Sequence, residues 1–235
     1  MPFAYESASA ASIPVIRLSL DARSAFLRRT YTHLFLTVAG FVGFELFLFN
    51  AGLALPIARG MLSVPWLLIL GAFMVAGWLA RSVAASAASP PLQYAALGGY
   101  VVAQGLIFVP VLVVAHLRMP GVLPAAALTT LVAFAALTAL VFVTRQDFSF
   151  MRGILMFASF ATLGLVVTSV IFGFTLGMAF SYAMVALACG FILYDTSNVM
   201  QNYRTEQHVA AALALFAAVM LLFWYVLRIF LDRRR

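Results

Sequence analysis

Residues 209–230 read VAAALALFAAVMLLFWYVLRIF, a run of 22 residues whose only charged member is Arg228. An α-helix rises 1.5 Å per residue, so about 20 apolar residues cross the hydrocarbon core of a bilayer. This run is therefore long enough and apolar enough to span a membrane. The other apolar runs of the chain must therefore be considered as candidate membrane spans too.

Six further runs of similar length precede it, and the breaks between them carry proline, glycine or polar residues. The faintest break is at residues 173–177, within an apolar stretch that is too long for one helix and is typical of a tight helical hairpin. The chain is thus predicted to be an all-α integral membrane protein, a bundle of seven transmembrane helices. The predicted spans are Tyr31–Leu55, Val64–Ala80, Leu92–Leu117, Leu123–Thr144, Phe150–Phe174, Leu176–Tyr194 and Val209–Phe230.

Composition supports this fold class, since 65% of the 235 residues are hydrophobic and 9% are charged, against roughly 25% charged residues in soluble domains. We expect three regions and no separate soluble domain. These are a flexible segment at 1–30, a transmembrane domain at 31–230 and a basic tail at 231–235.

The basic residues are all arginines, and they lie at the ends of the predicted spans and in connections. This distribution is typical of membrane topology and does not indicate nucleic-acid binding. With seven crossings, eight arginines fall on the side of the amino terminus and six on the other, so we expect a cytoplasmic amino terminus. The triple-arginine tail at 233–235 opposes that orientation.

Ionisable residues inside the predicted spans are costly and therefore informative. Glu45 lies deep in the first span. It either binds a proton or cation, or it forms a hydrogen bond to a neighbouring helix. His33 lies near the membrane interface, where a histidine with a structural role is expected more than a ligand. Arg81 and Asp195 end their spans at the same side of the membrane. They are either a charge pair that joins two helices or two unrelated interfacial charges.

The sequence gives little support for an enzyme. A retinal-type pigment needs a lysine for its Schiff base, and the chain has none. An aspartyl intramembrane protease needs two facing aspartates, and Asp195 is the only one expected in the bilayer. The histidines His33, His116 and His208 form neither a catalytic nor a metal-binding spacing, and the lone Cys189 is expected to be a small buried hydrophobe.

Four stretches together resemble the Bax inhibitor (TMBIM) family, in the branch that includes the bacterial YccA proteins. They are LRRTY at 27–31, TRQDFSF at 144–150, ILYDTSN at 192–198 and YVLRIF at 225–230. The resemblance covers nearly the whole chain after residue 25, and the ILYDTSN motif at the end of the sixth span is the most specific. It implies a multi-pass protein of the bacterial inner membrane whose seventh helix is central.

In the calcium-leak members of that family, an aspartate on the sixth helix pairs with one on the seventh, and an arginine ending the second helix engages the pair. Matched by motif, Asp195 is the first aspartate and Arg81 the arginine. The second aspartate falls at Ala218, and a common asparagine at Leu221, so the acid pair is missing. A lone carboxylate cannot share a proton with a second acid and cannot form the pH-sensitive latch of such a pair.

The YccA branch is also associated with binding and restraining a membrane AAA protease of the FtsH type. The resemblance therefore implies a non-enzymatic quality-control or stress modulator, without a cofactor, that binds such a protease. The amino-terminal segment before Ile13 has few large apolar residues and is expected to be accessible to a partner. The alternative is a pH-sensitive calcium or cation leak that uses Asp195, Arg81 and Glu45, with Gln104 on a polar path. No metal site is expected, and Asp195 is the residue that any calcium ion would approach.

Overall fold

The computed structural model describes residues 14–86 and 89–232, and within these ranges the chain is helical. Seven helices are long and apolar enough to cross a membrane, which confirms the predicted fold class. They are α2 (Leu20–Asn50), α4 (Trp66–Ala85), α5 (Pro90–Arg118), α6 (Val122–Thr144), α7 (Met151–Phe172), α8 (Met178–Gln201) and α9 (His208–Asp232). Three short helices accompany them, η1 (Val15–Arg17), α3 (Ala54–Leu62) and η2 (Thr205–Gln207).

The first span begins at Leu20, well before the predicted Tyr31. Ser19 caps it by accepting a hydrogen bond from the backbone N–H of Ala22, and Asp21 in the first turn suits the positive end of the helix dipole. The flexible segment that was predicted to extend to residue 30 is therefore shorter, because the described chain is already helical from Leu20. Residues 1–13 and 233–235, which hold the rest of that segment and the arginine tail, lie outside the described residues.

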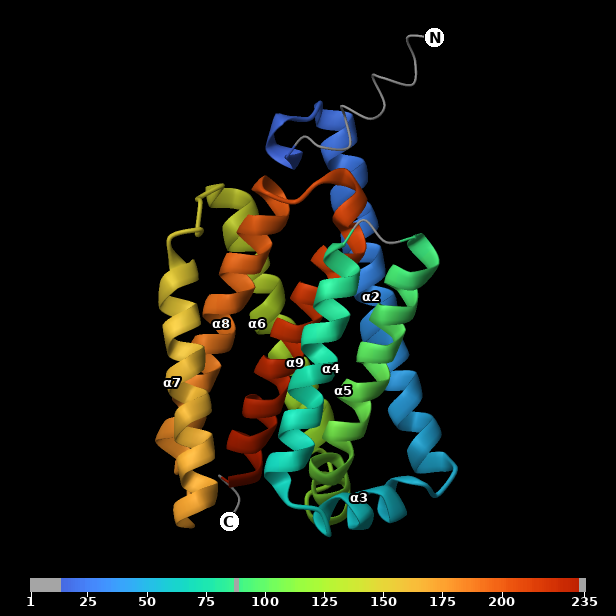
Figure 1. Ribbon diagram of the computed structural model, residues 1–235, viewed down its shortest axis with the longest axis vertical. Helices are drawn as coiled ribbons and strands as arrows, with labels where there is room; N and C mark the ends of the chain where they lie inside the picture. Colours follow the sequence, from blue (N-terminus) through green and yellow to red (C-terminus); the bar gives the residue numbers. More distant parts are fainter. Residues whose placement is uncertain (1–13, 87–88, 233–235) are drawn as a thin grey trace.

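Two other boundaries differ from the sequence prediction. The first span ends at Asn50, and a separate helix, α3, lies across the lower end of the bundle in Figure 1 and packs against α5. The sixth span continues past Tyr194 to Gln201, which carries Asp195 and Asn198 within the helix. The predicted hairpin between α7 and α8 is present, and Gly173 begins its turn at φ +71°, a conformation that glycine adopts without strain.

Helix α9 lies at the centre of the bundle, as the family resemblance implied, and contacts α2, α4, α5, α6 and α8 (Figure 1). Most of its apolar span is buried, 72%, whereas the peripheral α4 and α7 are 11% buried. The alternating bulky and small side chains of the quoted run explain this position. Phe216 and Leu213 are fully buried core residues, while alanines allow neighbouring helices to approach closely.

The other spans form an incomplete ring around α9. Successive contacts join α4 to α5, α5 to α6, α6 to α8 and α8 to α7. Helix α7 packs mainly against α8, and the side of α9 between α7 and α4 faces a large cavity that is described below. The first and last described residues lie at opposite ends of the bundle, as an odd number of crossings requires (Figure 1).

Candidate functional site

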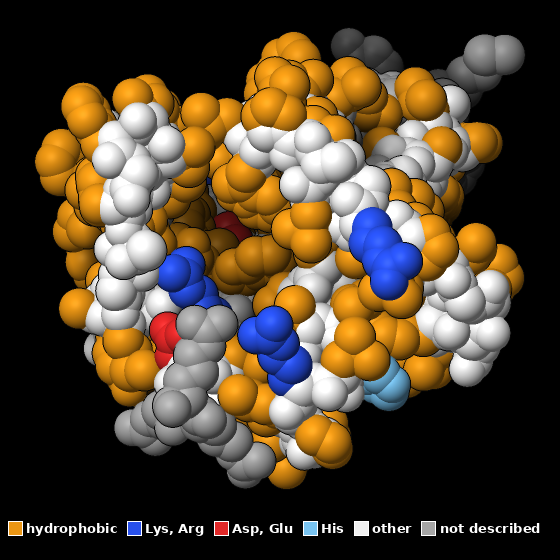
Figure 2. Space-filling model, turned by 90° about the horizontal axis from the view of Figure 1, so that it is seen from below, with side chains coloured by type: hydrophobic (Ala, Val, Ile, Leu, Met, Phe, Trp, Pro, Cys, Tyr) orange, Lys and Arg blue, Asp and Glu red, His pale blue; other side chains and the backbone are white. Residues whose placement is uncertain are grey.

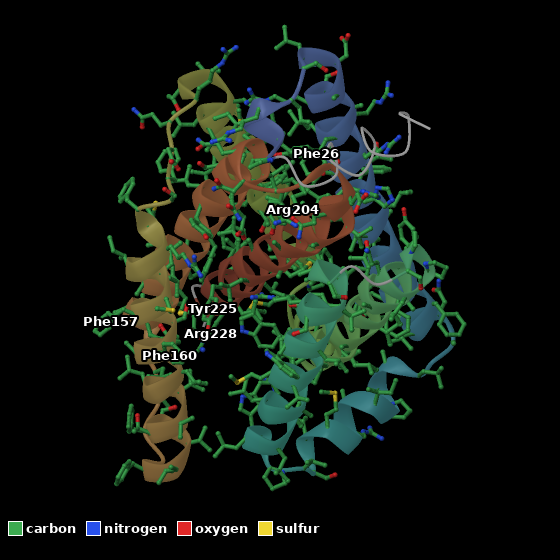
Figure 3. The ribbon with its side chains drawn as sticks, turned by 45° about the horizontal axis from the view of Figure 1, so that its top comes forward. Phe26, Phe157, Phe160, Arg204, Tyr225 and Arg228 are labelled. Carbon is green, nitrogen blue, oxygen red and sulfur yellow. The ribbon has the colours of Figure 1, made fainter. Side chains whose placement is uncertain are left out.

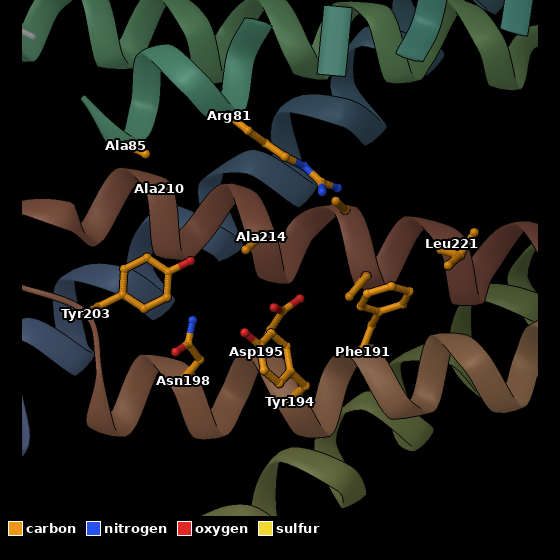
Figure 4. Close-up of a pocket in the computed structure, with 12 residues that line it drawn as sticks. Arg81, Ala85, Phe191, Tyr194, Asp195, Asn198, Tyr203, Ala210, Ala214 and Leu221 are labelled. Carbon is orange, nitrogen blue, oxygen red and sulfur yellow. The ribbon is translucent and has the colours of Figure 1, made fainter. Parts of the chain in front are cut away.

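A cavity of about 350 Å³, which we call the polar pocket, lies between α4, α8 and α9 (Figure 4). Small side chains on α9 create it, because Ala210, Ala214, Ala217 and Ala218 recur at helical spacing on the face that meets α8. Larger residues there would fill the space. Its other lining residues are Arg81, Ala85, Phe191, Tyr194, Asp195, Asn198, Tyr203 and Leu221.

The pocket brings together Arg81 and Asp195, the two charges that the sequence placed at the same side of the membrane. Figure 4 shows the guanidinium of Arg81 reaching from α4 toward the carboxylate of Asp195 on α8. They interact electrostatically, but among the described residues they form no direct salt bridge. Arg81 also interacts with the hydroxyl of Tyr100 on α5. The site is therefore a pair of opposite charges that face each other across an open cavity.

We expect Arg81→Ala and Asp195→Ala each to destabilise the fold in detergent, and the double variant to lose less than the sum, because no unmatched charge remains. The coupling should lie near the lower end of roughly 0.5–3 kcal/mol, since Arg81 is exposed to the open cavity. Thermal unfolding of the four proteins measures it. Strictly additive losses would contradict an interaction between the two side chains.

Tyr203 and Asn198 form the wall of the pocket nearest the amino-terminal end. Burial, with a smaller effect of Asp195, raises the pKa of the Tyr203 phenol far above its ordinary value, so its hydroxyl remains a donor at neutral pH. The amino-terminal segment holds this wall in place: the backbone N–H of Val15 donates to the Tyr203 carbonyl at 2.9 Å. Pro14 also forms a β-bridge with Arg204.

Two of the motifs that suggested the family contact each other beside this pocket. The Ser197 hydroxyl, in ILYDTSN, accepts a hydrogen bond from the backbone N–H of Phe148 at 3.0 Å and donates to the Gln146 carbonyl at 3.3 Å. Both partners belong to TRQDFSF, where Asp147 accepts from the Ser149 N–H at 2.8 Å. This contact anchors the connection between α6 and α7 to the helix that carries Asp195. The sequence did not predict it, because the two motifs are about 50 residues apart.

Glu45, the third site candidate, lies outside the polar pocket. Its side chain is buried at the contact between α2 and α5, beside Gly105 and Phe44. Among the described residues neither carboxyl oxygen has a hydrogen-bond partner, so the alternative that this acid bonds a neighbouring helix is not realised there. Gln104 faces the second cavity instead.

The histidines form a contact that sequence reasoning missed. His33 donates from Nδ1 to the Arg29 carbonyl at 2.6 Å, and its Nε2 meets the hydroxyl of Tyr94 at 3.1 Å. That hydroxyl also lies 3.3 Å from Nε2 of His208, so the three residues tie α2, α5 and α9 together. His33 is hydrogen-bonded as a structural histidine would be, while no metal-binding group of three His, Cys, Asp or Glu occurs among the described residues.

A second cavity, of about 750 Å³, extends from the polar pocket toward the opposite end of the bundle. We call it the lateral groove, since α4 and α5 line one side of it, α7 and α8 line the other, and α9 forms its floor. Figure 2 views this end and shows a hollow lined mainly by hydrophobic side chains, with a basic side chain at its edge and an acidic one inside it. Arg81, Phe191, Ala217 and Leu221 line both cavities and form the junction between them.

The polar pocket offers calcium few charged oxygen ligands. Calcium takes about 6–8 oxygen ligands, and the polar pocket offers one carboxylate together with an arginine that balances its charge. Ala218, where the resemblance expects the second acid, is 4% exposed and lines the same pocket as Asp195. The alanine that stands in place of the second acid therefore lies in the polar pocket itself.

The chain is similar to known proteins over most of its length. A family model described as "Inhibitor of apoptosis-promoting Bax1" matches residues 23–235. The protein named Bax inhibitor 1 of Schizosaccharomyces pombe is 29% identical over 92% of this chain and 79% of its own length. Protein LIFEGUARD 4 of Arabidopsis thaliana is 33% identical over 60% of this chain and 58% of its own length. An uncharacterized protein of Pseudomonas aeruginosa is 34% identical over 44% of this chain and 46% of its own length.

Proposed function

Because the chain belongs to the Bax inhibitor family, a family of non-enzymatic multi-pass membrane proteins, we propose that it is a pH-sensitive cation leak in which Asp195 and Arg81 form the gate. One observation carries this proposal. Asp195 faces Arg81 next to the junction between the polar pocket and the lateral groove, which together occupy most of the bundle's length.

The positive charge of Arg81 at the junction repels cations, and the negative charge of Asp195 attracts Arg81 into the polar pocket. Protonation of Asp195 removes this attraction, so the guanidinium of Arg81, which is the barrier to cations, changes its position. A change of pH on the side to which the pocket opens would therefore alter the leak. Asp195 alone binds calcium weakly, so the leak has little preference for calcium over monovalent cations.

Flux in liposomes tests the proposal. The purified protein should release potassium and sodium ions faster than protein-free vesicles, and Asp195→Asn should change both this rate and its pH dependence. Asp21→Asn is the matched control, because Asp21 is exposed at the start of α2 and lies outside both cavities. Folded protein whose flux equals that of empty vesicles would exclude the leak.

We also propose that the amino terminus faces the cytoplasm of a bacterial inner membrane, as the arginine distribution favours. The polar pocket would then open toward the cytoplasm and the lateral groove toward the other side. A fluorescent reporter fused before Met1 should be cytoplasmic, and one fused after Arg235 should lie across the membrane. The reverse pattern would invert this assignment.

Ala218 favours a second candidate, a modulator of the YccA type that binds an FtsH-type AAA protease. The alanine removes the carboxylate pair from the pocket, and a bundle without that pair can still serve as a partner. Copurification from native membranes in mild detergent tests this role. A stoichiometric AAA protease in the eluate, together with absent cation flux, would support the second candidate over the first.

A further inference from the structure

We propose that the lateral groove binds one phospholipid with an anionic headgroup, taken from the leaflet on the side of the bundle where α9 ends. The acyl chain lies between α4 and α7, and the phosphate binds Arg228. The groove is also part of the proposed cation path, so a bound lipid would narrow that path. Lipid binding is measured without any flux, and its test is independent of the proposed function.

The groove opens sideways into the bilayer. Several of its lining side chains also form part of the outer surface, since Phe160 is 68% exposed, Met74 46% and Val170 42%. They belong to α4 and α7, between which the ring of spans is incomplete. In a membrane, the molecules next to such an opening are lipids. The large apolar surface of the groove therefore contacts lipid and not water.

The walls present an apolar surface even where the sequence carries hydroxyl groups. Ser159 donates to the Leu155 carbonyl at 2.7 Å and Ser169 to the Val166 carbonyl at 2.8 Å. Both hydroxyls are thus satisfied within α7 and require no water or polar ligand. Most of the remaining lining is aromatic or aliphatic, which suits a hydrocarbon chain.

The length of the groove matches one leaflet. Along α9 it extends from Ala217 to Arg228, and eleven residues at 1.5 Å each make roughly 16 Å. The hydrocarbon core is about 30 Å thick, so one leaflet contributes about 15 Å. A chain that starts at the level of Arg228 therefore ends near the junction with the polar pocket.

Arg228 supplies the charge that selects an anionic headgroup. Its Nη2 donates to the Leu176 carbonyl at 2.9 Å, which fixes the side chain at the open end of the groove. A guanidinium has five N–H donors, so several remain for phosphate oxygens. Figure 3 shows Arg228 and Tyr225 on the side of α9 toward α7, while Phe157 points away from the bundle. Trp66, the first residue of α4, lines the same end, and tryptophan is enriched at this depth.

The experiment uses the full chain in nanodiscs of phosphatidylcholine and phosphatidylglycerol, followed by extraction into mild detergent and native mass spectrometry. The wild type should retain one phosphatidylglycerol per chain. Arg228→Gln should lower that preference about tenfold, because it removes a charge-assisted contact. Arg228→Lys should keep most of it. Arg118→Gln is the control, since Arg118 ends α5 at the same side of the membrane and does not line the groove.

A second pair of variants tests the position of the chain. Leu163→Trp fills the groove from α7 and should abolish retention of either lipid, whereas Leu165→Trp, on the exposed face of the same helix, should not. Wild-type retention in folded Leu163→Trp and Arg228→Gln proteins would overturn the proposal. Equal retention of the neutral and anionic lipids by the wild type would overturn the role of Arg228.

Discussion

Gly105→Ala is expected to lower the thermal stability of the protein in detergent, while Gly98→Ala on the same helix should leave it unchanged or raise it. A Cβ atom at residue 105 would overlap the ring of Phe44 and lie 3.3 Å from Oε1 of Glu45. Such crowding in a packed contact costs about 1–3 kcal/mol. At residue 98 a Cβ meets no atom within 4 Å, and alanine favours a helix over glycine by roughly 0.5–1 kcal/mol.

The two glycine variants can be compared by the reaction of Cys189 with a fluorogenic thiol dye during heating, because this residue is the only cysteine and is half-buried. The opposite signs expected at two sites of one helix separate crowding from helix propensity. Equal shifts of the unfolding temperature would mean that Phe44 turns away into the lipid and that α2 and α5 pack less tightly than described.

Ala218→Asp is expected to create calcium binding that the parent lacks. Residue 218 lines the polar pocket together with Asp195, and the extension of α8 to Gln201 keeps Asp195 within the helix at a matching depth. Two carboxylates supply more of the oxygen ligands that calcium requires. Binding should be strong when both acids are ionised and should weaken as the pH falls, because neighbouring acids then share a proton.

Ala218→Asn is the matched control for this variant, since it adds a side chain of nearly the same size without the charge. Titration with calcium at several pH values should show binding by the aspartate variant and none by the control or the parent. Replacing Asp195 by asparagine in the Ala218→Asp background should abolish the new binding. Strong, Asp195-dependent calcium binding by the parent would contradict the view that a lone acid is insufficient.

The sequence predicted those features that depend on length and apolar character. The seven spans, the hairpin around Gly173 and the common side of Arg81 and Asp195 all follow from runs of residues along the chain. The extent of the first span was wrong, because Leu20 to Thr30 are polar enough to leave the membrane and still continue the helix. Helix propensity and capping decide such an extension, and hydropathy does not.

The polar pocket itself was not predictable from the sequence. Alanine on α9 either lets a neighbouring helix approach or leaves a gap, and only the three-dimensional packing distinguishes these outcomes. Ala211 and Ala212 are fully buried against neighbouring helices, while Ala214 faces the cavity. The contact of His33, Tyr94 and His208 was missed for a related reason, since it joins three helices that are distant in sequence.

The central position of α9 has a consequence for biosynthesis. A ribosome makes this helix after the six other spans, so those spans enter the membrane before the helix that they surround. Until then, residues such as Phe41 and Phe108 lack Phe216 and Phe223, against which they pack in the finished protein. A nascent chain stalled before residue 208 would expose unsatisfied helix surfaces to chaperones and proteases. The bundle therefore forms only when α9 enters among the six spans that surround it.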